Sequence, residues 1–150
     1  MLRTSVAVPM QARPQPEPKE NDLLDPLWRL AGDLRHSQAL IVARHGLDLM
    51  CGLLRRGCPA ATVLRPGDKP DAGDYNLVVV PLVTALSSAD AVIRLARRSL
   101  APNGRLIAGL GDAKAASALA RRLRLNGFSA LHTTHLPGLV LLRADLRRRS

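Results

Sequence analysis

The sequence predicts an α/β protein, a three-layer sandwich whose mostly parallel sheet ends in an antiparallel C-terminal strand. From residue 38 onward, short apolar runs alternate with segments of helical periodicity, which is the pattern of a parallel sheet connected by helices. The last two apolar runs, 130–135 and 139–143, are joined only by the turn signal Pro137-Gly138. A link this short cannot form a parallel crossover, so the final strand is expected to run antiparallel.

Four parts make up the predicted organisation of the 150-residue chain. Residues 1–22 are rich in Pro, Gln, Glu and Lys and lack apolar periodicity, which is typical of a disordered tail. Residues 23–37 are predicted to contain a helix, residues 38–146 the α/β domain, and residues 147–150 a basic tail.

The N-terminal helix is predicted to open at Asp25-Pro26, because proline suits a first helical turn. Leu27, Leu30 and Leu34 recur on one face, and His36-Ser37 is expected to end the helix. The sequence therefore predicts a short amphipathic helix just before the domain.

The first half of the domain is predicted to hold two strands with a helix between them. Ala39–Ala43 is a continuous apolar run, β-branched at its centre, as expected of a strand buried on both sides. Leu47–Arg56 has helical periodicity and stops at Gly57. A second short strand is predicted at Ala61–Leu64, followed by a polar loop at Pro66–Gly73.

The second half of the domain alternates in the same way. Leu77–Val80 is the clearest strand in the chain, because four apolar residues, three of them valine, follow one another. The remaining predicted elements are a helix capped by Ser87 or Ser88 that runs to Leu100, a tight turn at Ala101–Gly104, a strand at Leu106–Ala108, and a helix from Asp112 to Asn126-Gly127.

The two cysteines are predicted to be free thiols. Cys51 and Cys58 lie seven residues apart in what the pattern predicts as one helix, which places them about two turns, or roughly 10 Å, from each other. That separation is too long for a disulfide, and free thiols favour a reducing cytoplasm. No apolar run approaches the roughly 18 residues of a membrane span.

The net charge of +10 comes almost entirely from arginine, and it leaves two interpretations open. One is a partner that is a polyanion, such as RNA, DNA or an acidic protein; the other is a compositional preference for arginine on solvated helix faces. Only one Trp, one Tyr and one Phe are present, which argues against stacking on single-stranded bases. The candidate residues of a basic face for a nucleic-acid backbone or a protein partner are Arg121, Arg122, Arg124, Arg147, Arg148 and Arg149.

Three segments in the second half resemble the class I S-adenosylmethionine-dependent methyltransferase family. Asp74–Pro81 resembles the family's fourth-strand segment, and Ala85–Ile107, with Ala101-Pro102-Asn103-Gly104, resembles the next helix and its turn into the fifth strand. Leu119–Phe128 resembles the following helix and its exit. The final antiparallel hairpin separates this fold from the nicotinamide-binding Rossmann fold. The resemblance implies a Rossmann-like methyltransferase fold with S-adenosylmethionine as cofactor.

The first half departs from that family's pattern. The family's first strand ends in an acidic residue and a glycine-rich turn, whereas Ala43–Leu47 has one glycine and no acid before it. The family's second strand ends in an acid that holds the ribose, but here Leu64 is followed by Arg65-Pro66. One strand–helix unit is therefore expected to be missing before Leu77. Leu47–Gly52 mimics the glycine motif. If it were the first strand and its turn, only Leu53–Arg56 would remain for the crossover helix, so we expect Leu47–Gly52 to be helical.

Candidate site residues follow from the resemblance, because open α/β sheets bind ligands at the carboxyl ends of their strands. His132 and His135 are expected to face opposite sides of one strand, so no metal site is predicted, and no residue is singled out as catalytic. The candidate cofactor-binding residues are Ala43, Arg44, His45, Gly46, Arg65, Asp68, Pro81 and Leu82.

Two functional hypotheses follow. The first is a methyltransferase-like protein that binds S-adenosylmethionine and transfers its methyl group to an acceptor. The second is a catalytically inactive methyltransferase fold that serves as a scaffold for a protein or nucleic-acid partner on its basic face. The hypotheses differ on whether a cleft at the end of the first strand is open, or is filled by Arg44, His45 and Leu47.

Overall fold

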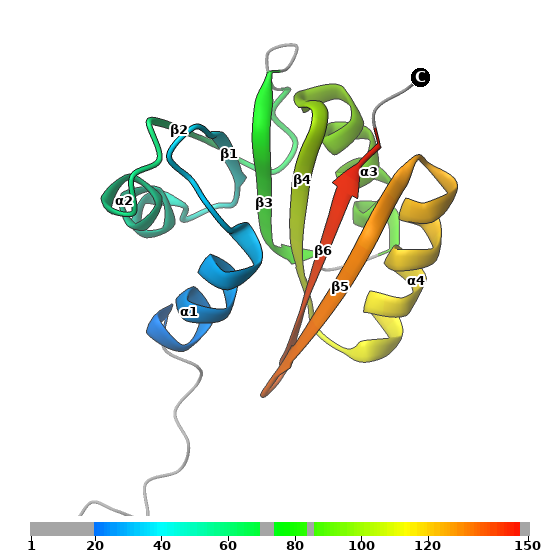
Figure 1. The fold of residues 1–150 in the computed structure, drawn as a ribbon. Helices are drawn as coiled ribbons and strands as arrows, with labels where there is room; N and C mark the ends of the chain where they lie inside the picture. Colours follow the sequence, from blue (N-terminus) through cyan, green and yellow to red (C-terminus); the bar gives the residue numbers. More distant parts are fainter. Residues whose placement is uncertain (1–19, 70–73, 84–85, 148–150) are drawn as a thin grey trace, which may run out of the picture.

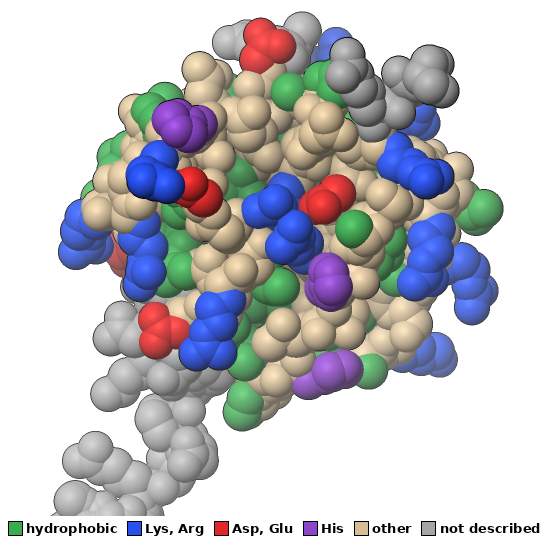
Figure 2. Space-filling model, viewed as in Figure 1, with side chains coloured by type: hydrophobic (Ala, Val, Ile, Leu, Met, Phe, Trp, Pro, Cys, Tyr) green, Lys and Arg blue, Asp and Glu red, His purple; other side chains and the backbone are tan. Residues whose placement is uncertain are grey.

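The computed structural model describes residues 20–69, 74–83 and 86–147, which form an α/β/α sandwich (Figure 1). Most of the predicted disordered tail, and Arg148 and Arg149 of the predicted basic tail, lie outside these residues. Lys and Arg side chains are spread over the face shown in Figure 2, as the net charge of the sequence leads one to expect.

Six strands build the sheet in the order β2-β1-β3-β4-β6-β5. Neighbouring strands from β2 to β4 are parallel, and β6 pairs antiparallel with both β4 and β5. The predicted antiparallel C-terminal strand is therefore confirmed. The strands are β1 (Gln38–Val42), β2 (Ala60–Leu64), β3 (Tyr75–Val83), β4 (Leu100–Leu110), β5 (Phe128–Leu136) and β6 (Leu139–Leu146).

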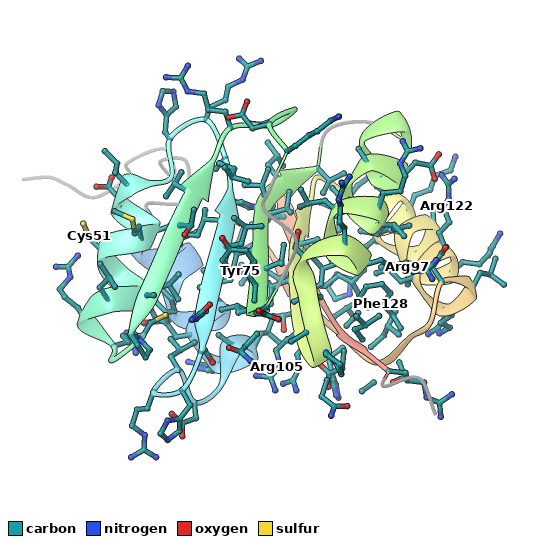
Figure 3. The ribbon with its side chains drawn as sticks, turned by 90° about the horizontal axis from the view of Figure 1, so that it is seen from above. Cys51, Tyr75, Arg97, Arg105, Arg122 and Phe128 are labelled. Carbon is teal, nitrogen blue, oxygen red and sulfur yellow. The ribbon has the colours of Figure 1, made fainter. Side chains whose placement is uncertain are left out.

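Two helices cover each face of the sheet (Figures 1 and 3). On one face lie α1 (Glu20–Ala31) and α2 (Leu47–Arg55), and on the other lie α3 (Leu86–Ser99) and α4 (Ala113–Leu125). Successive side chains of a strand point to opposite faces, so a strand between two helical layers must be apolar at every position. The central part of β3, residues 77–80, is fully apolar and buried for this reason.

The first half of the domain has one strand–helix unit fewer than the family pattern, as expected from the sequence. β2 pairs with β1 at the edge of the sheet, and β3 pairs with the other side of β1. Among the described residues between Leu64 and Tyr75, none lies in a helix or a strand. The segment Leu47–Gly52 that mimics the glycine motif is the first part of α2, as expected.

The N-terminal helix differs from its predicted bounds. α1 begins at Glu20, so Pro26 lies inside the helix and not in its first turn, which costs one backbone hydrogen bond. The helix ends at Ala31 because Gly32 adopts a positive φ of 74° and donates its N–H to the Trp28 carbonyl at 3.1 Å. Leu34 is therefore buried, as predicted, but beyond the helix.

Two of the predictions placed residues in the wrong local structure, namely the two cysteines and the turn at Ala101–Gly104. Cys58 lies outside α2, because Gly57, with a φ of 95°, reverses the chain after the helix. Cys51 is exposed and Cys58 is buried, so the two do not share a helix face. The predicted turn at Ala101–Gly104 lies within β4, where the pairing shifts from Tyr75 with Leu100 to Leu77 with Arg105.

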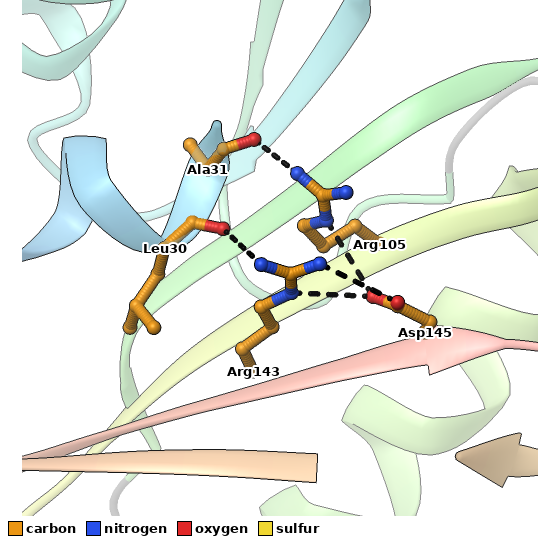
Figure 4. A network of polar contacts seen from close by, with 5 residues as sticks. All are labelled: Leu30, Ala31, Arg105, Arg143 and Asp145. Carbon is orange, nitrogen blue, oxygen red and sulfur yellow. Dashed lines mark hydrogen bonds and ion pairs between the residues drawn. The ribbon is translucent and has the colours of Figure 1, made fainter. Parts of the chain in front are cut away.

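A network of two arginines and one carboxylate fastens α1 to the sheet (Figure 4). Arg143 on β6 donates to the Leu30 carbonyl at 3.2 Å, and Arg105 on β4 donates to the Ala31 carbonyl. Asp145 lies 3.4 Å from Arg143 Nε and 3.5 Å from Arg105 Nε. The arginines thereby satisfy carbonyls at the C-terminal end of α1, where cations are favoured.

Candidate functional site

A cavity of about 760 Å³ opens at the carboxyl ends of β1 and β3. β2 and β3, the next two strands in the chain, pair with opposite sides of β1. The cavity therefore lies where the strand order reverses, at the topological switch point of the sheet. Its lining comes from the turn after β1, the loop after β2, the end of β3 and the inner side of α3. The residues are Val42, Ala43, Arg44, His45, Pro66, Gly67, Val80, Pro81, Leu82, Val83, Ala91, Val92 and Leu95.

The turn after β1 is held against β2 by the backbone. The Ala43 N–H donates to the Leu64 carbonyl at 2.9 Å, and the Gly46 carbonyl accepts from the Met50 N–H at 2.9 Å as α2 begins. Arg44 and His45 lie between these anchors and are exposed at the rim of the cavity. Leu47 is 66% exposed and is not among the lining residues. The cleft is therefore open and not filled by this turn.

A bulge at the end of β3 shapes the opposite wall. Val80 pairs with Ala108 and Val83 pairs with Leu110, so Pro81 and Leu82 together face Gly109 alone. An extra residue of this kind bends the strand and redirects its side chains. Leu82 is 56% exposed at the cavity as a result.

Gly109 is what allows the two strands to approach at this bulge. A Cβ atom built on Gly109 would lie 2.0 Å from the Pro81 carbonyl oxygen, a backbone atom that cannot move aside alone. Gly109 carries no signal in the sequence alone, because its contact partner lies 28 residues earlier in the chain (109 − 81).

Five of the eight predicted cofactor-binding residues line this cavity. They are Ala43, Arg44, His45, Pro81 and Leu82. Arg65 and Asp68 do not line it; they flank Pro66-Gly67, which does, and the Asp68 N–H donates to the Arg65 carbonyl at 3.1 Å. The α3 residues of the wall were not predicted as site residues, since their apolar spacing indicates only a core face.

Gly46, the single glycine of the turn, faces the sheet instead of the cavity. A Cβ atom at this buried position would lie 2.8 Å from Val63 Cγ1 and 3.2 Å from Ile41 Cγ2. Both neighbours are β-branched side chains, which have few alternative rotamers. Close packing between the turn and the first two strands therefore explains this glycine.

We expect Gly46→Ala to lower the free energy of unfolding by about 1–2 kcal/mol, because the added methyl overpacks this contact. The double variant Gly46→Ala/Val63→Ala should recover at least half of the loss, since it removes the clashing atoms. Urea denaturation of the three variants, Val63→Ala included, measures the coupling between the two positions. Strictly additive losses would contradict the assigned contact.

The charge on the described lining of the cavity is positive. Arg44 and His45 are its titratable side chains, and no Asp or Glu lines it within the part of the chain that the structure describes. The rest of the wall is apolar or backbone. The cavity thus offers an apolar slot with a cationic rim, and none of the described lining residues supplies a carboxylate for a ribose.

The predicted basic face is divided by the structure. Arg121 and Arg124 are exposed on α4, whereas Arg122 forms an ion pair with Asp90 of α3. Figure 3 shows Arg97 and Arg122 on the α3–α4 side of the sheet. Arg147 is exposed after β6, close to the ends of α3 and α4. Within the described ranges no cluster of three or more His, Cys, Asp or Glu is placed to bind a metal.

The fold is shared with many solved methyltransferases at low sequence identity. An S-adenosylmethionine-dependent methyltransferase from Mesorhizobium loti superposes with a TM-score of 0.66 at 10% identity, over 81% of this chain and 96% of that one. An RNA methyltransferase from Salinibacter ruber, solved with S-adenosyl-L-homocysteine, gives 0.61 at 14% identity, over 92% and 96% of the chains.

A third similar structure is larger than this chain. The Thermus thermophilus 16S rRNA N2 G1207 methyltransferase, in complex with AdoMet and guanosine, gives a TM-score of 0.66 at 16% identity. The similarity covers 91% of this chain but 45% of that one. No family model and no curated protein matches the sequence.

The chain thus has the Rossmann-like fold of the class I S-adenosylmethionine-dependent methyltransferases. No helix in the described part of the chain is long and apolar enough to cross a membrane.

Proposed function

We propose that this chain is a methyltransferase-like protein that binds S-adenosylmethionine in the cavity between β1 and β3. The observation that carries the proposal is an open cavity of about 760 Å³ at the switch point of the sheet. Small-molecule sites typically enclose about 300–1,000 Å³ and have mostly apolar walls. Two proteins of this fold were solved with AdoMet or S-adenosyl-L-homocysteine, which supports the same ligand class here.

The residues of the cavity suit the parts of this cofactor unequally. The apolar wall of Pro81, Leu82 and α3 suits a flat adenine ring, and Arg44 suits the carboxylate of the methionine part. Arg65 is a second candidate for that carboxylate, and Asp68 for the adenine or ribose, if their loop approaches the ligand. If Asp68 stays outside the cavity, as in this structure, the ribose loses charge-assisted hydrogen bonds worth about 1.5–3 kcal/mol each. Affinity is therefore expected to be roughly ten- to hundredfold weaker than with such an acid in place.

Methyl transfer asks little acid–base chemistry of the protein. The bound cofactor supplies a methyl group on a good leaving group, so the protein's task is to hold donor and acceptor in line. A base is needed only where the acceptor must lose a proton. His45 at the rim is the candidate for that role, because it is the one imidazole among the described lining residues.

Calorimetry with S-adenosylmethionine and S-adenosyl-L-homocysteine tests the proposal. We expect measurable heat with at least one of them, and Leu82→Arg should weaken binding at least about tenfold by placing a charged side chain in the apolar slot. Leu54→Arg is the matched control, since Leu54 is 43% exposed on α2 and does not line the cavity. Absence of heat and of any thermal shift at millimolar ligand would remove this proposal.

One observation favours a second candidate, a catalytically inactive scaffold. The described lining of the cavity has a cationic rim and no acidic side chain, which disfavours the sulfonium cation of the cofactor. Such a scaffold would act through its basic surface, on a protein or nucleic-acid partner. It predicts no response to either cofactor form, and it predicts that Leu82→Arg leaves partner binding unchanged.

A further inference from the structure

A second open groove lies at the other end of the sheet from the cavity, where β4 begins and β6 ends. It has a volume of about 770 Å³ and is bordered by the C-terminal halves of α3 and α4, the start of β4 and the end of β6. None of its lining residues borders the cavity between β1 and β3. An inference about this groove therefore does not depend on cofactor binding.

Four arginines line the groove, namely Arg94, Arg97, Arg98 and Arg147. The first three stand at i, i+3 and i+4 on α3, so their side chains leave the helix on one side. All four are exposed, and none takes part in the five ion pairs formed among the described residues. The described lining includes no Asp or Glu.

The favourable interaction of cations with the C-terminal end of a helix accounts for only two of these four arginines. Arg97 and Arg98 stand in the last turn of α3, where cations interact favourably with the helix carbonyls. Arg94 precedes that turn, and Arg147 comes from a different part of the chain, directly after β6. Bringing four like charges around one groove costs electrostatic energy, which an anionic ligand would offset.

Apolar side chains stand beside these arginines. Leu125 is 80% exposed, and Pro102 is also exposed; both line the groove. A ligand that repeats negative charges next to apolar surfaces would satisfy both kinds of side chain. A single-stranded nucleic acid has this chemistry, with phosphates along the chain and base and sugar faces between them.

We propose that the groove lined by Arg94, Arg97, Arg98 and Arg147 binds the phosphate backbone of a single-stranded nucleic acid. Recognition rests on charge and on apolar contact from Leu125 and Pro102. No aromatic side chain lines the described groove, so binding should be insensitive to base sequence. The groove, and not the outer face of α4, is then the nucleic-acid surface of this fold.

Fluorescence anisotropy with a labelled, unstructured RNA of about 20 nucleotides tests the proposal, since single-strand sites span about 4–16 nucleotides. Arg94→Glu/Arg98→Glu should weaken binding at least about tenfold. The slope of log K against log salt concentration should become less negative by about 1.4, because two phosphate contacts are lost. Arg29→Glu/Arg55→Glu, which makes the same change in net charge on α1 and α2, should weaken binding less than about threefold.

Four results would overturn the proposal. The first is that the unmodified chain does not bind the RNA, and the second is that the groove variant and its control lose affinity equally. The third is a larger loss of affinity in Arg121→Glu/Arg124→Glu than in the groove variant. The fourth is that polyglutamate displaces the RNA as effectively as unlabelled RNA does. Circular dichroism checks that the variants fold. If charge reversal prevents folding, Arg94→Gln/Arg98→Gln replaces it, and we expect a loss of at least about threefold.

Discussion

Replacing Gly109 with alanine should lower the free energy of unfolding by about 3 kcal/mol or more, which corresponds to roughly 10 °C in Tm for a domain of this size. The added Cβ would lie 2.0 Å from the Pro81 carbonyl oxygen, so β4 must separate from β3 at the bulge that lines the cavity. Thermal unfolding followed by far-ultraviolet circular dichroism measures the change.

Gly111→Ala is the matched control for this substitution. Gly111 lies two residues further along, is exposed, and has no atom within 4 Å of a Cβ built on it. We expect its Tm to stay within about 2 °C of that of the unmodified chain, because a surface substitution of this kind changes stability by about 0.5 kcal/mol or less. Similar midpoints for the two alanine variants would show that β3 and β4 do not meet as described.

Asp145→Ala should lower the free energy of unfolding by about 2 kcal/mol and loosen α1. The Asp145 side chain is 29% exposed and lies between Arg105 and Arg143, which are 28% and 23% exposed. Without the carboxylate, two partly buried guanidinium groups face each other on adjacent strands, and breaking a buried ion pair in this way is strongly destabilising. Partial exposure reduces the effect. Urea denaturation measures it, and hydrogen exchange of the α1 amides should become faster.

An exposed ion pair next to α1 provides the comparison for Asp145. Asp33 pairs with Arg35 at 3.0 Å, and both side chains are more than half exposed. Hydrogen bonds from the Arg35 side chain lower the pKa of Asp33 from 3.8 to about 2. The small stabilisation from this pair is present above pH 4 and is lost as the pH falls toward 2. At neutral pH, a loss from Asp33→Ala as large as that from Asp145→Ala would contradict the special role given to the Arg105–Asp145–Arg143 network.

The sheet was predictable because its signals are local. The valines of β3 must be apolar on both faces, and Pro137-Gly138 marks a hairpin directly in the sequence. The bounds of α1 were predicted less well, because Pro26 indicates a helix start when considered alone. Gly32 was the better signal, since it ends the helix through its positive φ.

The candidate site was predictable only where it follows the strands. Ala43 and Pro81 line the cavity because the carboxyl ends of β1 and β3 meet at one edge. Gly109 and the arginines of the groove depend on contacts between elements far apart in the sequence. Arg94 and Arg147 line the same groove only because α3 and the end of β6 lie near each other in the fold, and no spacing in the sequence indicates this.

Helix α3 lies between the two candidate binding regions and belongs to both. Ala91, Val92 and Leu95 border the cavity, whereas Arg94, Arg97 and Arg98 border the groove. A rotation or shift of this one helix changes both regions together, because a helix moves as a rigid body. If a ligand in one region alters the affinity of the other, thermodynamic linkage requires the reverse effect to have the same magnitude. A titration of either ligand in the presence of the other therefore reports on the freedom of α3 to move.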